Sequence, residues 1–132
     1  MACAEVGAHM ATMWEARVVR VLDGDTVSVT AAREGDPEIH LRLLGIDAPE
    51  KSQLYGAEAT AVMKGLLSRS HVILVEATGL DKYRRTLANI YTKADHGRWR
   101  GISVNQLMVR LGAAWFGRQY SVPRPLFPLA YA

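Results

Sequence analysis

The sequence contains a single cysteine, Cys3, among its 132 residues. One cysteine cannot form an internal disulfide, and it excludes a zinc site built on several cysteine thiolates. No hydrophobic run approaches the roughly 18 residues that a membrane-spanning helix needs, so we expect no membrane partner. The segment from Met1 to Trp14 lacks a basic region followed by an apolar stretch, so no secretory signal is visible. The compartment is therefore expected to be cytoplasmic if the chain is complete, and extracellular if a signal was removed.

The remaining composition is that of one folded domain. About half of the residues are hydrophobic (49%) and 22% are charged, which is enough apolar material for a core. Lysine and arginine number 16 against 13 acidic residues, which gives a net charge of +3 and a pI near 9.2. A mildly basic domain suits a polyanionic partner but does not demonstrate one.

Hydrophobic periodicity predicts five strands and two helices. Period-two segments rich in β-branched residues predict strands at residues 16–22, 26–30, 39–44, 71–76 and 87–91. An apolar stripe with helical spacing predicts a helix at residues 56–68. Ser103, followed three residues later by Gln106, resembles a capping box and opens a second helix that Gly112 ends.

The element order β-β-β-α-β-β-α favours a mainly β protein with helices (α+β). Five short antiparallel strands with a helix after the third suit a small, partly open barrel of the oligonucleotide-binding (OB) type. We expect a loose N-terminal segment at 1–13, the folded domain at 14–120, and a tail at 121–132 whose three prolines exclude a regular helix.

Charged residues gather where two predicted strands meet. In an antiparallel pair the start of one strand lies beside the end of the other, which brings Asp25 near Asp47, with Glu50 just beyond. Three converging carboxylates are best tolerated around a hard cation, and Arg42 on the same strand pair offers a planar group that matches a phosphate. The alternative stays open that Asp25 is ordinary turn chemistry and that the others are solvated surface residues.

At these residues the sequence resembles the staphylococcal nuclease-like (thermonuclease) family. The two most specific matching segments are VLDGDTV at 21–27 and LRLLGIDAPE at 41–50. Further matching segments follow in the same order at 55–59, 81–88 and 104–112, so that the resemblance covers roughly residues 14–120.

The resemblance implies a five-stranded barrel that cleaves phosphodiester bonds in DNA and RNA with Ca²⁺ as cofactor. The metal ligands would be the side chains of Asp25 and Asp47 and the backbone carbonyl of Ala48. Glu50 would be the general base for the attacking water, or would only position it. Arg42 and Arg85 would hold the phosphate and offset the charge that develops on it.

Three further residues match positions at which the family contacts the nucleotide: Lys82, Tyr83 and Tyr120. An aromatic face under a base contributes about 1–3 kcal/mol with little sequence preference, although the two tyrosines also suit a half-buried structural role. Asn105, which opens the second helix, is interpreted as a structural residue that hydrogen-bonds a loop.

Two departures from the family pattern stand out. Arg84 occupies a position where the family usually has glycine, which is unfavourable if the backbone there has a positive φ. The proline-rich tail stands in place of the family's third helix, and the surface so exposed suggests a homodimer.

From the resemblance as a whole, we expect a nuclease acting on single-stranded or frayed DNA and RNA. The alternative is a weakly active or inactive nucleic-acid-binding or protein-interaction module of the same fold.

Overall fold

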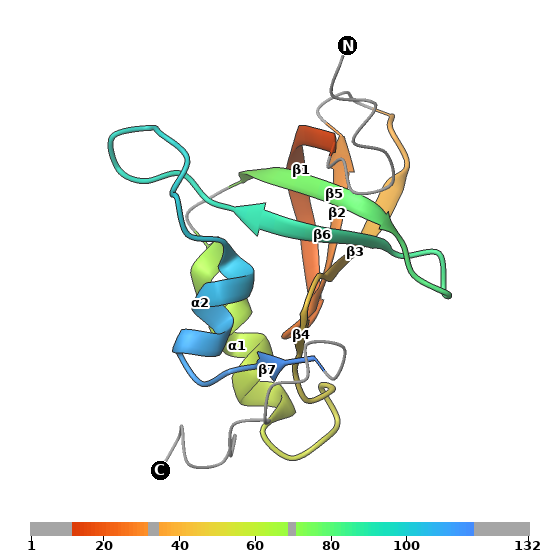
Figure 1. The fold of residues 1–132 in the computed structure, drawn as a ribbon, viewed down its shortest axis with the longest axis vertical. Coiled ribbons are helices and arrows are strands. Elements are labelled where there is room, and N and C mark those ends of the chain that lie inside the picture. The colour runs from red at the N-terminus through yellow and green to blue at the C-terminus, as the bar shows by residue number, and fades with distance from the viewer. Residues whose placement is uncertain (1–11, 32–34, 69–70, 118–132) are drawn as a thin grey trace.

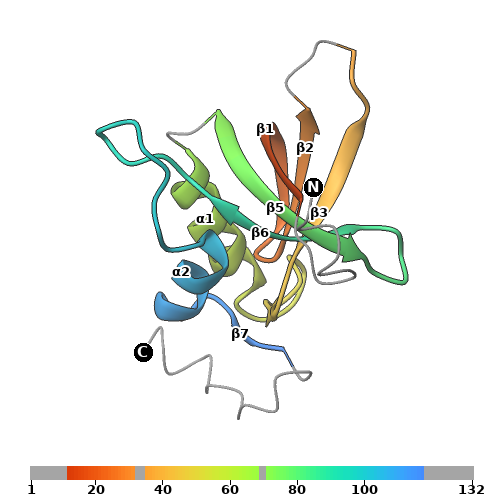
Figure 2. The ribbon, with the colours of Figure 1, turned by 45° about the horizontal axis from the view of Figure 1, so that its top comes forward.

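The computed structural model describes residues 12–31, 35–68 and 71–117. Five strands form a closed barrel in the order β1-β2-β3-β6-β5, and two helices lie together beside it (Figures 1 and 2). The barrel strands are β1 (Thr12–Asp23), β2 (Thr26–Ala31), β3 (Glu38–Leu43), β5 (Val72–Leu80) and β6 (Thr86–Tyr91). The predicted OB-like α+β architecture is therefore confirmed.

One strand pair differs from the prediction. Four of the five pairings in the barrel are antiparallel, but β3 and β6 run parallel, with Arg42 opposite Leu87. An odd number of strands cannot alternate in direction around a closed ring, so one pair must point the same way. The expectation of antiparallel pairing throughout was wrong for this reason.

A second, two-stranded sheet was not predicted. It consists of β4 (Ile46–Asp47) and β7 (Trp115–Phe116), which pair antiparallel with Asp47 opposite Trp115. The backbone amide of Gly117 extends this pairing by donating to the carbonyl of Gly45 at 2.8 Å. The small sheet therefore fixes the backbone of Asp47, one of the predicted metal ligands.

The two helices cover one end of the barrel and complete the core. Helix α1 (Gly56–Leu67) buries Ala59, Met63 and Leu67, and α2 (Val104–Arg110) buries Val104 and Met108. Ser103 caps α2 as expected, because its side chain accepts a hydrogen bond from the backbone of Gln106 at 3.1 Å. Within the described residues, no helix is long and apolar enough to cross a membrane.

Asn105 links α2 to the barrel from a buried position. Its side-chain oxygen accepts from the backbone amide of Ile90 at 3.1 Å, and its Nδ2 donates to the carbonyls of Leu44 (2.9 Å) and Ala88 (3.0 Å). The predicted structural role of Asn105 is therefore confirmed.

The predicted boundaries fall largely outside the described residues. Thr12 and Met13 belong to β1, although the sequence placed them in the loose segment. Tyr120, the tail at 121–132, the missing third helix and the homodimer hypothesis that depends on it lie outside the described residues.

Candidate nucleic-acid cleavage site

Arg42 lies between the carboxylates of Asp25 and Asp47, which the strand pairing was predicted to bring together. Its NH2 nitrogen is 2.5 Å from Asp47 Oδ1 and 3.3 Å from Asp25 Oδ2. The register of β2 and β3 explains the meeting, because Thr26 pairs with Arg42 and so places Asp25 beside it. Asp47 enters from β4, after the turn that ends β3, rather than from the end of β3 itself.

The Arg42 side chain is held in one orientation. Its NH1 nitrogen donates to the carbonyl of Leu43 at 2.9 Å and to the carbonyl of Ile46 at 2.8 Å. Only 17% of the side chain is exposed. A guanidinium group fixed in this way is preorganised, because it loses little rotamer freedom when an anion binds.

Asp25 is buried and accepts several hydrogen bonds. Its carboxylate accepts from the backbone amide of Ala48 at 2.8 Å and from the Thr26 hydroxyl at 2.9 Å. Burial raises the pKa of the Asp25 carboxyl above its usual range, although the Arg42 guanidinium and the hydrogen bond from Ala48 act to lower it. Positive charge near this buried carboxyl therefore favours its ionised form.

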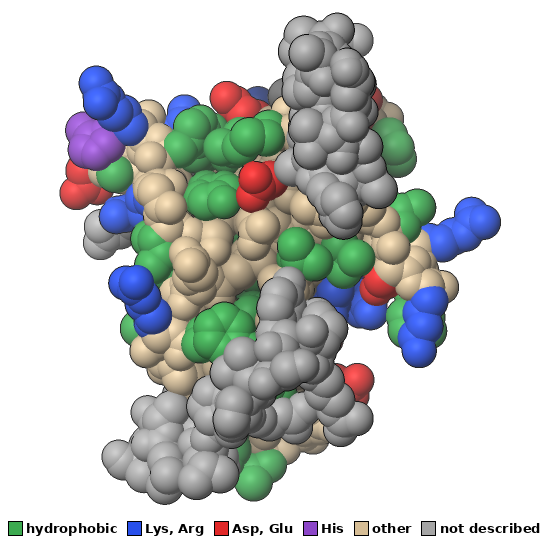
Figure 3. All heavy atoms as spheres, in the orientation of Figure 1, with side chains coloured by type: hydrophobic (Ala, Val, Ile, Leu, Met, Phe, Trp, Pro, Cys, Tyr) green, Lys and Arg blue, Asp and Glu red, His purple; other side chains and the backbone are tan. Residues whose placement is uncertain are grey.

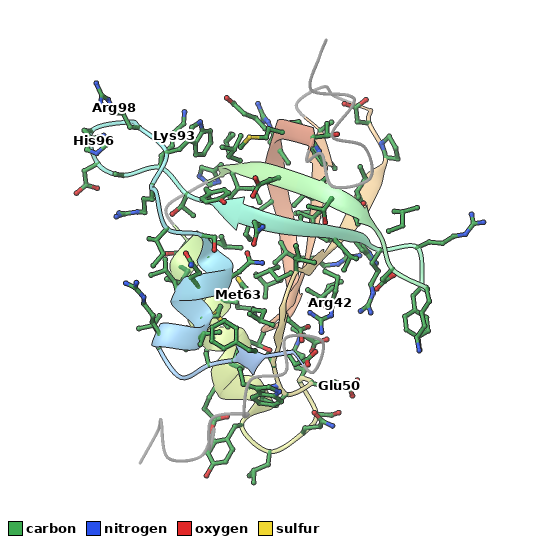
Figure 4. All side chains as sticks on the ribbon, viewed as in Figure 1. Arg42, Glu50, Met63, Lys93, His96 and Arg98 are labelled. Carbon is green, nitrogen blue, oxygen red and sulfur yellow. The ribbon has the colours of Figure 1, made fainter. Side chains whose placement is uncertain are left out.

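Glu50 lies on the exposed loop that leads into α1, below Arg42 in the view of Figure 4. Its backbone amide donates to Gln53 Oε1, and its carbonyl accepts from the amide of Gln53, both at 2.8 Å. Among the described residues, no three acidic, histidine or cysteine side chains converge as a metal-binding group. The three-carboxylate cluster predicted from the sequence is therefore reduced to two carboxylates with Arg42 between them.

Gly56 permits the tight path of the Glu50 loop. A Cβ atom at position 56 would lie 1.8 Å from the carbonyl oxygen of Glu50, which no side chain can tolerate. Asp23 secures the other side of the loop, since its carboxylate accepts from the backbone amide of Lys51 at 2.8 Å. The position of Glu50 is thus set by neighbours that hold its backbone.

Arg85 is placed by a tight turn between β5 and β6. Asp81 accepts hydrogen bonds from Arg85 Nε at 2.7 Å, from the Arg85 amide at 2.8 Å and from the Tyr83 amide at 2.9 Å. Partial burial acts to raise the pKa of Asp81, but these hydrogen bonds outweigh it and hold that pKa below its usual range. Arg84 in the same turn has a φ of 65°, so the left-handed conformation suspected from the sequence is present.

The two arginines face one hollow. It has a volume of about 200 Å³, and Arg42 and Asp47 line one part of it while Asp81, Lys82, Tyr83 and Arg85 line another. Tyr83 is exposed, with Lys82 Nζ 5.2 Å and Arg85 Cζ 5.3 Å from the centre of its ring. The structure therefore brings together five of the predicted residues around one space, while Tyr120 lies outside the described residues.

Sequence reasoning missed the role of two acidic residues, Asp81 and Asp23. Both are positioning residues, because Asp81 organises the turn that carries Arg85, and Asp23 ties the Glu50 loop to the end of β1. Each aspartate lies at a turn, and aspartate commonly accepts from backbone amides nearby. This preference of aspartate at turns could have predicted the positioning role of both residues.

Comparison with known proteins agrees with this geometry. The profile of the family described as "Staphylococcal nuclease homologue" matches residues 40–126. The chain belongs to this family. A protein of Escherichia coli named "Uncharacterized endonuclease" is 42% identical over 113 residues, which cover 86% of this chain and 67% of that protein.

Two further relatives carry nuclease names. The "Micrococcal nuclease" of Shigella flexneri is 38% identical over 108 residues, which cover 80% of this chain and 60% of that protein. The "Thermonuclease" of Staphylococcus hyicus is 37% identical over 82 residues, which cover 57% of this chain and 47% of that protein. This family member thus spans about half to two thirds of the length of these relatives.

Proposed function

We propose that this member of the staphylococcal nuclease homologue family hydrolyses phosphodiester bonds in DNA and RNA, with Ca²⁺ as its cofactor. The observation that carries the proposal is the hollow that both Arg42 and Arg85 line together with Asp47, while Asp25 lies 3.3 Å from Arg42. Two fixed guanidinium groups suit a phosphodiester, because negative charge develops on its oxygens during hydrolysis. The nuclease names of the relatives support the same activity.

The donor atoms present suit a hard cation. Oxygens of Asp25 and Asp47 converge on a single nitrogen of Arg42, and the carbonyl of Ala48 would complete the predicted set. Ca²⁺ prefers oxygen ligands, and a cation near Asp25 would offset the cost of ionising this buried group. When bound, the ion supplies positive charge that polarises the phosphate.

The chain's own residues divide the remaining work. Arg42 and Arg85 bind the phosphate oxygens, and losing either contact should lower the rate by about 10²-fold or more. Glu50 accepts the proton of the attacking water, a step generally worth about 10²–10⁴-fold. Lys82 and the exposed face of Tyr83 contact the nucleotide next to the cleaved bond. Unpaired bases can stack on such a face, which favours single-stranded or frayed substrates.

One observation favours a second candidate function. Arg42 and Arg85 are each already paired with a carboxylate of the protein, and Arg84 strains the turn that carries Arg85. A protein whose arginines kept these partners would bind nucleic acid without cleaving it. This is the weakly active or inactive binding module of the same fold.

To distinguish the nuclease from the binding module, the protein is incubated with denatured DNA and Ca²⁺, with and without a chelator. Chelator-sensitive cleavage supports the nuclease, and retention of DNA without cleavage supports the binding module. Glu50→Gln should keep binding and lose at least about 10²-fold in turnover. Glu58→Gln is the matched control, because Glu58 is an exposed carboxylate on α1. Equal turnover of the two variants would remove Glu50 from the mechanism.

A further inference from the structure

The loop between β6 and α2, residues 92–101, projects from the molecule in a defined conformation (Figures 1 and 2). Its tip is closed by two hydrogen bonds of 2.8 Å, from the Ala94 amide to the Arg98 carbonyl and from the Gly97 amide to the Ala94 carbonyl. At its base, Lys93 pairs with Trp99 as an isolated β-bridge, and Lys93 Nζ lies 5.0 Å from the centre of the Trp99 ring. We call residues 92–101 the projecting loop.

The projecting loop carries more positive than negative charge. Lys93, Arg98 and Arg100 are exposed cations, and Asp95 is its only carboxylate. Within the described part of the chain, none of the three cations forms an ion pair, whereas Arg20, Arg42 and Arg85 all do. Figure 3 shows basic side chains and a histidine gathered at this corner of the surface. These cations remain available to an external anion.

A large hollow lies at the base of the projecting loop. Its volume is about 640 Å³, and its walls include the apolar side chains of Leu66, Val72, Ile102 and Leu107. Lys93 and Arg100 line it as well, together with His71 and Asp95. Sites for small organic ligands commonly measure about 300–1,000 Å³ and combine apolar walls with a few charged groups. A sugar and base could occupy such a space while the cations contact the adjoining phosphates.

This surface is separate from the cleavage site. The residues that line the large hollow and those that line the hollow of Arg42 and Arg85 do not overlap. Figure 4 shows Lys93, His96 and Arg98 at the opposite side of the molecule from Arg42 and Glu50. An anion bound at the projecting loop would therefore not compete for the catalytic hollow.

We propose that the projecting loop and the hollow at its base form a second binding surface for the phosphate backbone of a nucleic-acid strand, outside the cleavage site. The proposal takes its substrate class from the proposed function. Each phosphate neutralised by a lysine or arginine releases counterions, so separate contacts on one strand add affinity without any base preference. A strand long enough to reach both surfaces would be retained while one part of it occupies the catalytic hollow.

The test measures binding of a fluorescein-labelled single-stranded oligonucleotide of about 30 nucleotides, by anisotropy, with a chelator present. The variant Arg98→Gln with Arg100→Gln removes two loop charges. The variant Lys64→Gln with Arg110→Gln removes two exposed charges elsewhere and is the matched control. We expect the loop variant to bind about five- to tenfold more weakly than the control. When log affinity is plotted against log salt concentration, the slope for the loop variant should be less negative by about 1.4. Each lost phosphate contact with a single strand removes about 0.7 from that slope.

A third variant, Arg98→Lys with Arg100→Lys, keeps the charge and should restore most of the affinity. Failure of this rescue would show that loop shape, not charge, had been lost, and would overturn the proposal. Equal DNA affinity of the loop variant and its control would also overturn it. The proposal would also be overturned if the loop variant kept its DNA affinity but no longer bound vesicles of anionic phospholipid. That result would assign the surface to a membrane. Because the chelator prevents Ca²⁺-dependent cleavage, these outcomes stand whether or not the protein proves to be a nuclease.

Discussion

Arg85 is held by Asp81, four residues before it, through a 2.7 Å hydrogen bond from Nε to the carboxylate. Asp81→Asn removes the charge from this contact and weakens the turn that aims Arg85 at the hollow. We expect turnover to fall by about tenfold to 10²-fold, because small misplacements of a catalytic group are costly. Glu58→Gln, measured in the same cleavage assay, should leave turnover unchanged. Full activity of Asp81→Asn would show that Arg85 needs no such support.

The same substitution should change how stability depends on pH. The pKa of Asp81 in the folded protein lies below its ordinary value of 3.8, so the ionised form stabilises the fold. This contribution is fully present above about pH 4 and is lost as the pH falls through the lowered pKa. Urea unfolding at a series of pH values should show the stability gap between wild type and Asp81→Asn closing below pH 4. If the difference in free energy of unfolding between the two proteins does not change with pH, the pKa of Asp81 is not lowered in the folded protein.

Asp25 should change the pH dependence of stability in the opposite direction. Burial raises its pKa in the folded protein, so stability declines as the pH rises from 3.8 through that raised value and the carboxyl ionises. Asp25→Asn keeps the side-chain shape without the buried charge. We expect it to raise the thermal unfolding midpoint at neutral pH in the presence of a chelator, and to abolish Ca²⁺ uptake measured by calorimetry. A lower midpoint would mean that attraction to Arg42 outweighs the cost of burial.

Arg84 is a departure from the family pattern that substitution can test directly. Its φ of 65° costs a side-chain-bearing residue about 1–2 kcal/mol, whereas glycine adopts this conformation freely. Arg84→Gly should therefore stabilise the protein by up to about 1 kcal/mol, after allowing for the greater chain entropy of glycine when unfolded. Arg84→Ala removes the same side chain but keeps the strain, so its free energy of unfolding should not rise. Equal gains from both would rule out backbone strain as the cause.

Local sequence signals predicted most of the barrel and part of the site. The turn at Gly24 and Asp25 follows β1, and the antiparallel pairing of β2 with β3 places Thr26 opposite Arg42, so the approach of Asp25 to the end of β3 could be inferred. The pairing of Asp47 with Trp115 could not, because two-residue strands show no periodicity and these residues lie far apart in the chain. The position of Arg42 between Asp25 and Asp47 depends on individual side-chain atoms, which a pattern of residue types does not specify.

Asn105 offers the clearest test of how the two helices and the barrel are joined. Asn105→Ala would leave the amide of Ile90 and the carbonyls of Leu44 and Ala88 without the partners that Asn105 provides. A buried polar group without a partner costs about 1–3 kcal/mol, so we expect a total loss of about 3 kcal/mol in the free energy of unfolding. Gln106→Ala, at the exposed next position, should change it by less than about 0.5 kcal/mol. Asn105 also holds the carbonyl of Leu44, which precedes the turn into β4 and the predicted metal ligand Asp47. Asn105→Ala should therefore lower the affinity for Ca²⁺ under conditions where the variant is still folded. A variant that unfolds early yet binds Ca²⁺ normally would show that Asn105 stabilises the fold without positioning Asp47.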